Sequence, residues 1–410
     1  MNSINQFCPD KKMISAEHLF KKDVSYELDC FDEQTIAFFN EVSSVLLKNK
    51  LFNRNPEIVS LGFWLRKSNI LSFKKENNYL LENKLYYLNP VGQVFHVAPS
   101  NVDTIFLYSI CISLLMGNRN IVRVSSRSTP VVDFIIDSMN AVLAKKEFNV
   151  FKEYINIITY GHDDELSRYF SEHVDCRVIW GGDNTVKHFK AMPTRVHTKD
   201  IFFPNRISYS VFNASQFNKA KEEEKKQAAN NFFNDAYVFD QMGCSSPKII
   251  YVLGTVKEKE IFIDSFYKYL NLLTKEKYKS QAAALSSLKF NVLVDDVIGH
   301  ELKNVIKTDN SIYLIEVEKE ETLNFNCGGG YFYIKHIAAL EEIKNDIHHY
   351  SQTLAYFGIS EKELIALDKV LKGKGVDRIV PIGQALAFSY IWDGMNLLEA
   401  FSRKRRIELK

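Results

Sequence analysis

Short apolar runs alternate with longer amphipathic stretches between residues 93 and 203. Each run has the length of a buried strand, and the stretches between the runs carry apolar residues at helical spacing. The runs lie at residues 93–97, 120–124, 154–159, 176–180 and 201–203. Strands that alternate with helices predict a parallel, doubly wound sheet, in which ligands bind at the carboxyl ends of the strands.

Residues that favour helix ends mark several of the predicted helices. The chain before residue 90 is predicted to be mainly helical, and Asp32 is placed to cap one of its amphipathic helices. Ser100 or Asn101 is expected to cap the strongly apolar helix 102–116. Pro130 is expected to open the helix that follows the second strand.

A further strand at 209–212 and a charged amphipathic helix over 218–236 follow, and the elements past Cys244 predict a second α/β domain. These elements are a strand at 249–253, a helix over 257–274, and strands near 289–294, 312–317, 331–334 and 352–358. Cys327 and the three glycines after it are predicted to form a turn before one of these strands. A phosphate-binding loop there lacks the Lys-Ser/Thr signature.

Composition narrows the class of protein. The chain has 410 residues, of which 46% are hydrophobic and 25% charged, as in an ordinary globular protein with two domains. A net charge of +2 argues against a nucleic-acid-binding protein. Six scattered cysteines without a C-x-x-C pair argue against a zinc site or a disulfide scaffold and fit a reducing cytoplasm. The most apolar window, 102–116, is too short to span a bilayer.

Cys244 is the strongest candidate for chemistry in the sequence. It lies in the small polar turn Gly243–Ser246, directly before the apolar run 249–253. A cysteine that only fills a core would lie inside the apolar run. Backbone amides of a small-residue turn can stabilise a thiolate and hold an oxyanion beside it. The window alone leaves two interpretations open, a nucleophile and an ordinary turn cysteine.

Two further turns could bind ligands. Gly181 and Gly182 separate a strand from a helix, where the backbone can approach a phosphate closely, although glycine is common in such turns. The acids Asp163, Asp164 and Glu165 could bind a metal, but they fit a helix N-cap with first-turn carboxylates better. We therefore predict no metal site.

Eight segments together resemble the aldehyde dehydrogenase superfamily, and within it the LuxC-type fatty acyl-CoA reductase family of bacterial bioluminescence. They occur in family order and cover the chain from about Ile58 to its end. The segments are LGFWLRK (61–67), PSN (99–101), GNRNIVRVSSR (117–127), WGGD (180–183), QMGCSSP (241–247), QTLAYFG (352–358), VDRIVPIGQAL (376–386) and WDG (392–394).

The resemblance implies an aldehyde dehydrogenase-like fold with two doubly wound α/β domains. Residues 1–239 would form the nicotinamide nucleotide-binding domain with its helical N-terminal region. Residues 240–388 would form the catalytic domain, and residues 389–410 would return to the first domain or to a subunit interface. Because members of the superfamily are commonly dimers or tetramers, the resemblance also implies a homo-oligomer.

The resemblance assigns roles to single residues. Cys244 matches the catalytic nucleophile, and Asn101 matches the asparagine whose amide helps to hold the oxyanion. Arg123 falls where the superfamily has a lysine against the cofactor ribose. Ser126 replaces a glutamate that NAD-preferring members use for the ribose hydroxyls, and Arg127 follows it. Loss of that carboxylate favours NADPH as the cofactor.

Three further residues complete the cofactor-binding set that the resemblance implies: Ser125, Gly181 and Gly182. One departure concerns the reaction type. Hydrolytic aldehyde dehydrogenases carry a glutamate that activates water, whereas Phe202 is nearest to that position here. Without a general base, an acyl-enzyme thioester survives long enough to accept a hydride or to exchange with a thiol.

The sequence therefore predicts an oxidoreductase, an acylating aldehyde dehydrogenase or acyl-CoA reductase. Cys244 would capture the acyl group of an acyl-CoA or acyl-carrier thioester, and NADPH would reduce it to the aldehyde. Two alternatives stay open. One is a cysteine acyltransferase that uses no cofactor, and the other is an inactive scaffold for an acyl-activating partner. An acyl-activating synthetase is a candidate partner, and the acyl chain itself is not predicted.

Overall fold

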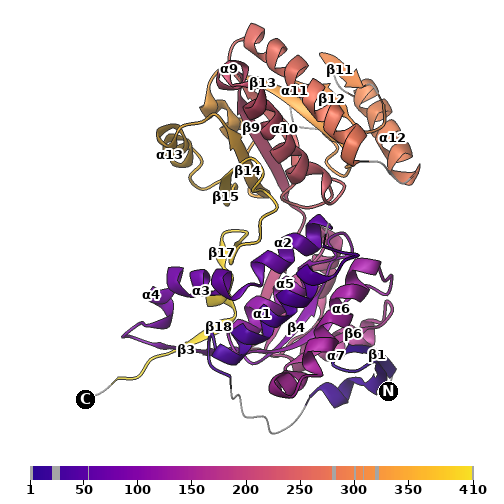
Figure 1. Cartoon of the computed structure of the whole chain (residues 1–410). Coiled ribbons are helices and arrows are strands. Elements are labelled where there is room, and N and C mark those ends of the chain that lie inside the picture. The colour runs from indigo at the N-terminus through magenta and orange to yellow at the C-terminus, as the bar shows by residue number, and fades with distance from the viewer. Residues whose placement is uncertain are drawn as a thin grey trace. The chain divides into compact units, whose positions relative to one another are not determined.

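The computed structural model describes residues 3–20, 28–53, 55–278, 283–299, 302–307, 309–318 and 323–408. The chain forms two compact units, each with its own sheet (Figure 1). Unit 1 consists of Met1–Pro204 and Phe388–Lys410, and unit 2 of Asn205–Ala387. Unit 2 is thus a continuous stretch of chain, whereas unit 1 is made of two stretches.

The sheet of unit 1 has seven strands in the order β2-β1-β6-β5-β4-β7-β8. Its strands are β1 (Ser3–Cys8), β2 (Lys12–Ser15), β4 (Gln93–Val97), β5 (Arg119–Arg123), β6 (Ile155–Thr159), β7 (Cys176–Trp180) and β8 (Lys199–Phe203). The five strands from β6 to β8 are parallel, and β1 joins them antiparallel. Following the sequence, β5 and β6 are added on one side of β4, and β7 and β8 are then added on its other side. This reversal makes a topological switch point between β4 and β7.

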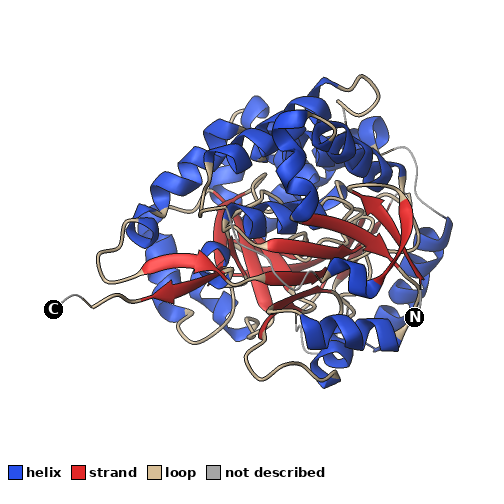
Figure 2. Cartoon of the chain, turned by 90° about the horizontal axis from the view of Figure 1, so that it is seen from below, coloured by secondary structure: helices blue, strands red, loops and turns tan. Residues whose placement is uncertain are grey.

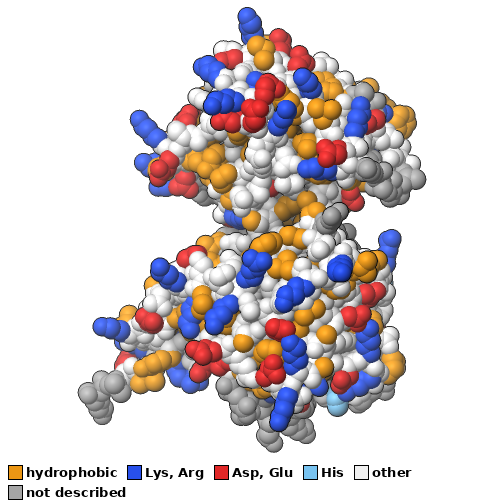
Figure 3. Space-filling model, viewed as in Figure 1, with side chains coloured by type: hydrophobic (Ala, Val, Ile, Leu, Met, Phe, Trp, Pro, Cys, Tyr) orange, Lys and Arg blue, Asp and Glu red, His pale blue; other side chains and the backbone are white. Residues whose placement is uncertain are grey.

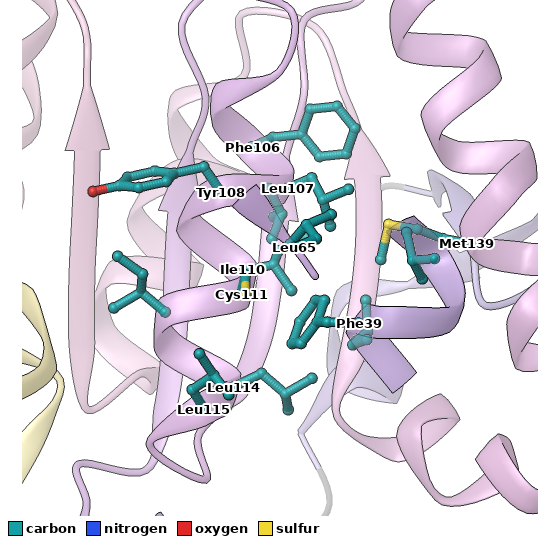
Figure 4. Packing of buried hydrophobic residues seen from close by; sticks show 14 of the residues in the cluster. Phe39, Leu65, Phe106, Leu107, Tyr108, Ile110, Cys111, Leu114, Leu115 and Met139 are labelled. Atoms are coloured by element: carbon teal, nitrogen blue, oxygen red, sulfur yellow. The ribbon is translucent and has the colours of Figure 1, made fainter. Parts of the chain in front are cut away.

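Helices cover the strands of unit 1 (Figure 2). They are α1 (Glu33–Lys48), α2 (Pro56–Trp64), α3 (Lys67–Glu76), α4 (Asn78–Leu81), α5 (Ile105–Leu115), α6 (Pro130–Leu143), α7 (Asp164–His173) and α8 (Asp183–Ala191), with 3-10 turns at Ala16–Leu19 and Lys146–Glu153. Every residue of α5 is buried. Phe39 of α1 and Met139 of α6 lie in the same apolar cluster as Cys111 and Leu114 of α5 (Figure 4).

The C-terminal segment completes unit 1. It contains β16 (Ile391–Trp392), β17 (Met395–Asn396), α14 (Leu397–Ala400) and β18 (Ser402–Arg405). β18 pairs antiparallel with β3 (Tyr87–Pro90), and the two strands form a ribbon of their own (Figure 1). Leu397, Leu398 and Phe401 are buried in the core of unit 1. Basic and acidic side chains are interspersed over the surface seen in Figure 3, in keeping with the small net charge.

The sheet of unit 2 has the order β11-β12-β13-β10-β9-β14-β15. Its strands are β9 (Ile207–Asn213), β10 (Pro247–Leu253), β11 (Asn304–Lys307), β12 (Tyr313–Glu316), β13 (Tyr331–Ile337), β14 (Ser351–Phe357) and β15 (Arg378–Pro381). All neighbours are parallel except β11, which is antiparallel to β12. The helices are α9 (Ala214–Lys219), α10 (Glu222–Tyr237), α11 (Val256–Lys277), α12 (Ala283–Gly299) and α13 (Glu361–Val370), with a 3-10 turn at Leu340–Asn345.

Several sequence expectations are confirmed in detail. Asp32 caps α1 by accepting bonds from the next turn. Pro130 opens α6. Asp163 caps α7 with a 2.9 Å bond from the backbone N–H of Leu166. The acids around Asp163 therefore have the capping role that the sequence favoured.

Other expectations are wrong. The segment 289–294 is not a strand but the middle of α12. The chain before residue 90 is helix-rich as expected, with α1 to α4, but it also contains the strands β1 and β2, whose short alternating patterns were not recognised. Neither Ser100 nor Asn101 caps α5, because the helix begins later and Thr104 occupies the N-cap position.

The structural boundary between the units also differs from the expected division after Phe239. Unit 2 begins at Asn205, because β9 lies between β10 and β14 in its sheet. Helix α10 belongs to unit 2 as well, since its Phe232 packs with Phe212 and Phe266 in that unit's core.

Candidate active site

The predicted cofactor-binding residues gather at one edge of unit 1. Because the strands are parallel, the segments that follow β4, β5 and β7 all leave the sheet at its carboxyl edge. Asn101 lies after β4, Ser125, Ser126 and Arg127 lie after β5, and Gly181 and Gly182 lie after β7. The switch point between β4 and β7 places the asparagine loop and the glycine pair after neighbouring strands.

The glycine pair leads into the N-terminus of α8. Gly182 is the N-cap residue, and no side chain caps the helix. A Cβ atom on Gly181 would lie 3.0 Å from the side chain of Thr185. Uncapped backbone N–H groups at a helix N-terminus can bind a phosphate. The carboxylate of Asp183, the first helical residue, would have to turn away from such a ligand.

Arg123 is turned toward the neighbouring strand β6. Its guanidinium lies 4.5 Å from the ring centre of Tyr160 and donates a 3.1 Å hydrogen bond to the carbonyl of Gly161. The Nε atom of Arg123 is buried and has no partner among the described residues. In the loop that follows, Ser125 Oγ accepts a 3.2 Å bond from the backbone of Arg127. Ser126 and Arg127 themselves are exposed.

Cys244 lies at the amino edge of the sheet in unit 2. The turn that carries it precedes β10 and begins with two residues at positive φ, Asp240 and Gln241. A 2.9 Å bond from the N–H of Ser246 to the carbonyl of Gly243 closes the turn. Left-handed backbone at two successive non-glycine residues is costly, so the surrounding structure must hold it in place.

Hydrogen bonds from neighbouring strands hold the Cys244 turn. Ser208 of β9 donates a 2.7 Å bond to the carbonyl of Cys244 and accepts a 3.1 Å bond from the N–H of Thr353 on β14. Ser245 donates a 2.8 Å bond to Gln352 of β14. Two strands on the same side of β10 therefore hold the Cys244 carbonyl and the side chain of the next residue.

The other five cysteines are in environments that disfavour a thiolate. Burial raises the pKa of Cys8, Cys30, Cys111, Cys176 and Cys327, to about 12 for Cys30 and Cys176 and to about 11 for Cys327. Cys244 is half-buried just before the amino end of strand β10. Nucleophilic cysteines are partly exposed, whereas deeply buried ones are unreactive. Cys30 is partly exposed as well, but burial raises the pKa of its thiol, and Cys244 is the partly exposed cysteine that lies in a turn before a buried strand.

Comparison with known proteins identifies the family. The model of the acyl-CoA reductase (LuxC) family matches residues 29–404. The chain belongs to this family.

Two relatives with curated names are similar over most of this LuxC-family chain. The long-chain acyl-protein thioester reductase of Aliivibrio fischeri is 23% identical over 299 residues, which cover 72% of this chain and 59% of the relative. The protein of the same name from Vibrio harveyi is 25% identical over 303 residues, with the same two coverages. The chain therefore matches about three fifths of the length of these relatives.

Solved aldehyde dehydrogenases share the fold of this LuxC-family chain. The NAD-dependent aldehyde dehydrogenase of Sinorhizobium meliloti superposes with a TM-score of 0.66 at 10% identity, covering 93% of this chain and 82% of that chain. The predicted fold class, an aldehyde dehydrogenase-like pair of α/β domains, is confirmed. No helix in the described part of the chain has the length and apolarity to cross a membrane.

The structure places the predicted site residues in two groups. Asn101 and the cofactor-binding candidates belong to unit 1, and Cys244 belongs to unit 2. Phe202 lies on β8, and Asp200 on the same strand is held by Arg177 through two 2.7 Å bonds. The carboxylate of Asp200 is therefore engaged in an ion pair.

Sequence analysis did not identify the residues that hold Cys244. Ser208 and Gln352 are distant in sequence, and nothing in a single sequence shows that β9 and β14 lie side by side. Lys248 and Cys327 also meet beside the turn, through a 2.6 Å bond from Lys248 Nζ to the carbonyl of Cys327. The charged Lys248 at the start of an apolar strand was a signal that could have been used.

Proposed function

We propose that this chain reduces an acyl thioester to the aldehyde through a covalent acyl intermediate on Cys244. The observation that carries the proposal is the position of Cys244 in this member of the LuxC family. Its thiol is half-buried just before the amino end of strand β10, on a turn that is held by two neighbouring strands. The names of the two curated relatives support a thioester substrate.

In this mechanism, the Cys244 thiolate attacks the carbonyl carbon of the substrate. A bond forms between that carbon and Sγ, and the bond to the sulfur of coenzyme A or of a carrier protein breaks. The leaving thiolate takes up a proton. The backbone N–H of Cys244 and the side-chain amide of Asn101 are our candidates for holding the oxyanion of the tetrahedral intermediate. The bond from the N–H of Ser246 to the carbonyl of Gly243 fixes the Gly243–Cys244 peptide, which contains this backbone donor, so the donor is oriented before the reaction.

We further propose a nicotinamide nucleotide at the carboxyl edge of unit 1. The uncapped N-terminus of α8 after Gly182 suits a phosphate, and the buried, unpartnered Nε of Arg123 is a spare donor at the same edge. When bound, the reduced nucleotide supplies the hydride that the acyl carbon accepts. Cys244 Sγ is then the leaving group as the aldehyde departs.

NADPH is the proposed form of the nucleotide. The segment Ser125–Arg127 contains no carboxylate that would repel a 2′-phosphate, and the guanidinium of Arg127 is exposed. Two carboxylates contact the end of this loop, and each accepts a hydrogen bond from a hydroxyl group. Asp133 accepts a bond from Ser128, and Asp103 accepts one from Thr129, each at 2.5 Å.

The test combines turnover with detection of the intermediate. Purified protein is mixed with acyl-CoAs of increasing chain length, or with an acylated carrier protein, and with NADPH or NADH. We expect thioester-dependent oxidation of NADPH, faster than that of NADH, and an aldehyde that hydrazine traps. Cys244→Ala should abolish both signals, whereas Cys30→Ala, a change at the other partly exposed cysteine, should keep them.

Intact-mass measurement separates the competing functions. An acyl adduct on Cys244 that forms without nucleotide oxidation under any condition would favour a cysteine acyltransferase. Aldehyde production that persists in Cys244→Ala would refute the role of Cys244. No adduct and no turnover with any thioester would leave the scaffold alternative.

A further inference from the structure

A buried lysine lies beside the turn that carries Cys244. Lys248 is the second residue of β10, and its side chain is 9% exposed. Among the described residues, no carboxylate lies within ion-pair distance of its ammonium group. Its Nζ atom instead donates 2.6 Å bonds to two backbone carbonyls, those of Gln241 and Cys327. Burying an ammonium group without an anion is costly, so a structural role alone explains it poorly.

The two carbonyls belong to segments that fit closely together. Gln241 Nε2 donates to the carbonyl of Tyr331 at 2.8 Å, and its Oε1 accepts bonds from the N–H groups of Gly330 and Tyr331 at 3.0 and 2.9 Å. A Cβ atom on Gly328 would lie 2.4 Å from the carbonyl oxygen of Asp240. The triple-glycine segment, Gly328–Gly330, therefore packs closely against the Cys244 turn. The two hydrogen bonds from Lys248 link the turn to this segment.

The charge of Lys248 acts on the sulfurs of this cluster. Burial lowers the pKa of Lys248 to about 8, and electrostatic interaction with Cys327 and Cys244 opposes that decrease. The ammonium form therefore predominates at neutral pH. Cys327 is a poor anion, because burial raises the pKa of its thiol to about 11. Of the two cysteines that interact electrostatically with Lys248, only Cys244 is partly exposed.

Other charged groups around the cluster interact with Cys327 or with one another rather than with Lys248. Lys289, whose pKa burial also lowers to about 8, donates to the carbonyl of Gly329 at 2.8 Å. Asp296 accepts bonds from Tyr331 and Tyr333 at 2.6 and 2.8 Å. Asp240 accepts a bond from Tyr278 at 2.5 Å. Asp309 and Lys307 interact electrostatically with Lys289 rather than with Lys248.

We propose that Lys248 is a positioning residue for Cys244, whose ammonium group ties the Cys244 turn to the triple-glycine segment and favours the thiolate of Cys244 over the thiol. A nearby cation stabilises a thiolate and so lowers the pH at which the sulfur becomes nucleophilic. The inference rests on the proposed role of Cys244 as nucleophile, but it needs neither the acyl substrate nor the nucleotide.

The experiment measures alkylation of Cys244 by iodoacetamide between about pH 5.5 and 9.5, using the full chain and peptide mass analysis. We expect an apparent pKa below the value of about 8.5 of an ordinary cysteine. Lys248→Met and Lys248→Gln should move the profile upward by about one pH unit, so that the rate at pH 7 falls about tenfold. Lys248→Arg keeps the charge and should keep the wild-type profile.

Lys335→Met is the matched control. Lys335 lies on the neighbouring strand β13, and its Nζ makes two bonds, at 2.6 and 2.5 Å, to Asp346. Its loss should lower the melting temperature without moving the alkylation profile. A profile that is unchanged in both neutral Lys248 variants would overturn the inference. So would a wild-type apparent pKa of about 8.5 or higher, a result that requires no variant to fold.

The outcomes also separate this inference from the proposed function. A profile that shifts in Lys248→Met, together with absence of any thioester reduction, would refute the reductase and keep Lys248 as the electrostatic partner of Cys244. Thioester reduction through Cys244, together with an alkylation profile that does not shift in the Lys248 variants, would support the reductase and refute the role of Lys248.

Discussion

His96 is a buried histidine whose proton position is fixed by its neighbours. Asn120 Nδ2 donates to the carbonyl of Asn118, so its Oδ1 faces His96 Nε2 at 2.9 Å and must accept. His96 Nδ1 then accepts from Ser109 Oγ at 2.8 Å, and Ser109 in turn accepts from Trp180 Nε1 at 3.2 Å. This chain joins β4, α5 and β7 beneath the proposed nucleotide edge and requires neutral His96.

The stability of unit 1 should therefore decrease in mild acid. Burial lowers the pKa of His96 to about 4, whereas an unfolded histidine has a pKa of about 6.5. The unfolded chain thus binds a proton that the folded chain does not, and the free energy of unfolding falls as the pH drops from about 6.5 to about 4. His96→Gln should be less stable at pH 7, by about 1–3 kcal/mol, and should lose this part of the pH dependence.

Urea unfolding followed by tryptophan fluorescence measures the effect, because all three tryptophans (Trp64, Trp180 and Trp392) belong to unit 1. Equal pH dependence in wild type and His96→Gln would show that other groups cause it.

At the scale of elements, the sequence predicts best where apolar side chains are buried and charged side chains are exposed, which is the usual rule. The strands β4 and β7 lie at the predicted residues, since their apolar runs are buried in the sheet. Helix α12 reverses the rule, because its Lys289 and Asp296 are buried. Its exposed face carries Phe290, Val294, Val297 and Ile298. A prediction that places apolar residues inside therefore took part of this helix for a strand.

The triple-glycine segment is an element whose role was not predicted, and Gly328→Ala tests it. The added methyl group would meet the carbonyl of Asp240 at 2.4 Å and the sulfur of Met242 at 2.7 Å. Because the first contact is with backbone, the Cys244 turn must shift. We expect alkylation of Cys244 and thioester turnover to fall about tenfold or more, while the circular dichroism spectrum is retained.

Gly299→Ala is the matched control for this substitution, since a Cβ atom there meets no described residue within 4 Å. Equal activity of the two alanine variants would show that the turn tolerates displacement.

At the scale of the molecule, the sequence predicted two α/β domains and which segments follow the carboxyl ends of the strands in unit 1, because parallel strands share their carboxyl ends. It did not predict the contacts around Cys244. Gln241, Lys248 and Cys327 meet only once the sheet order places β13 beside β10. Strand order depends on long-range pairing, which the pattern of one sequence does not contain. For the same reason, a single sequence did not show that β9 pairs with β10 and β14.

The insertion of unit 2 between the two parts of unit 1 leads to the last prediction. The segment after Ala387 supplies apolar groups to the core of unit 1. Phe388 stacks on Tyr108 at 5.1 Å, and Phe401 is buried and accepts a 2.8 Å bond from Asn118 through its carbonyl. Unit 2 is a continuous stretch that holds Cys244 and its supporting network. Removal of residues 388–410 should therefore destabilise unit 1 and leave unit 2 folded.

Two probes distinguish the units in such a truncated chain. Tryptophan fluorescence should show unit 1 unfolding at lower urea concentration than in the full chain. The alkylation profile of Cys244 should keep its wild-type pH dependence, because Lys248 and Cys244 lie in the intact unit. Phe401→Ala is the milder form of the same change and should cost about 3–5 kcal/mol in unit 1, as expected for a truncated buried phenylalanine. If truncation moved the alkylation profile as far as Lys248→Met does, the Cys244 turn would depend on unit 1, and unit 2 alone would not set the reactivity of the nucleophile.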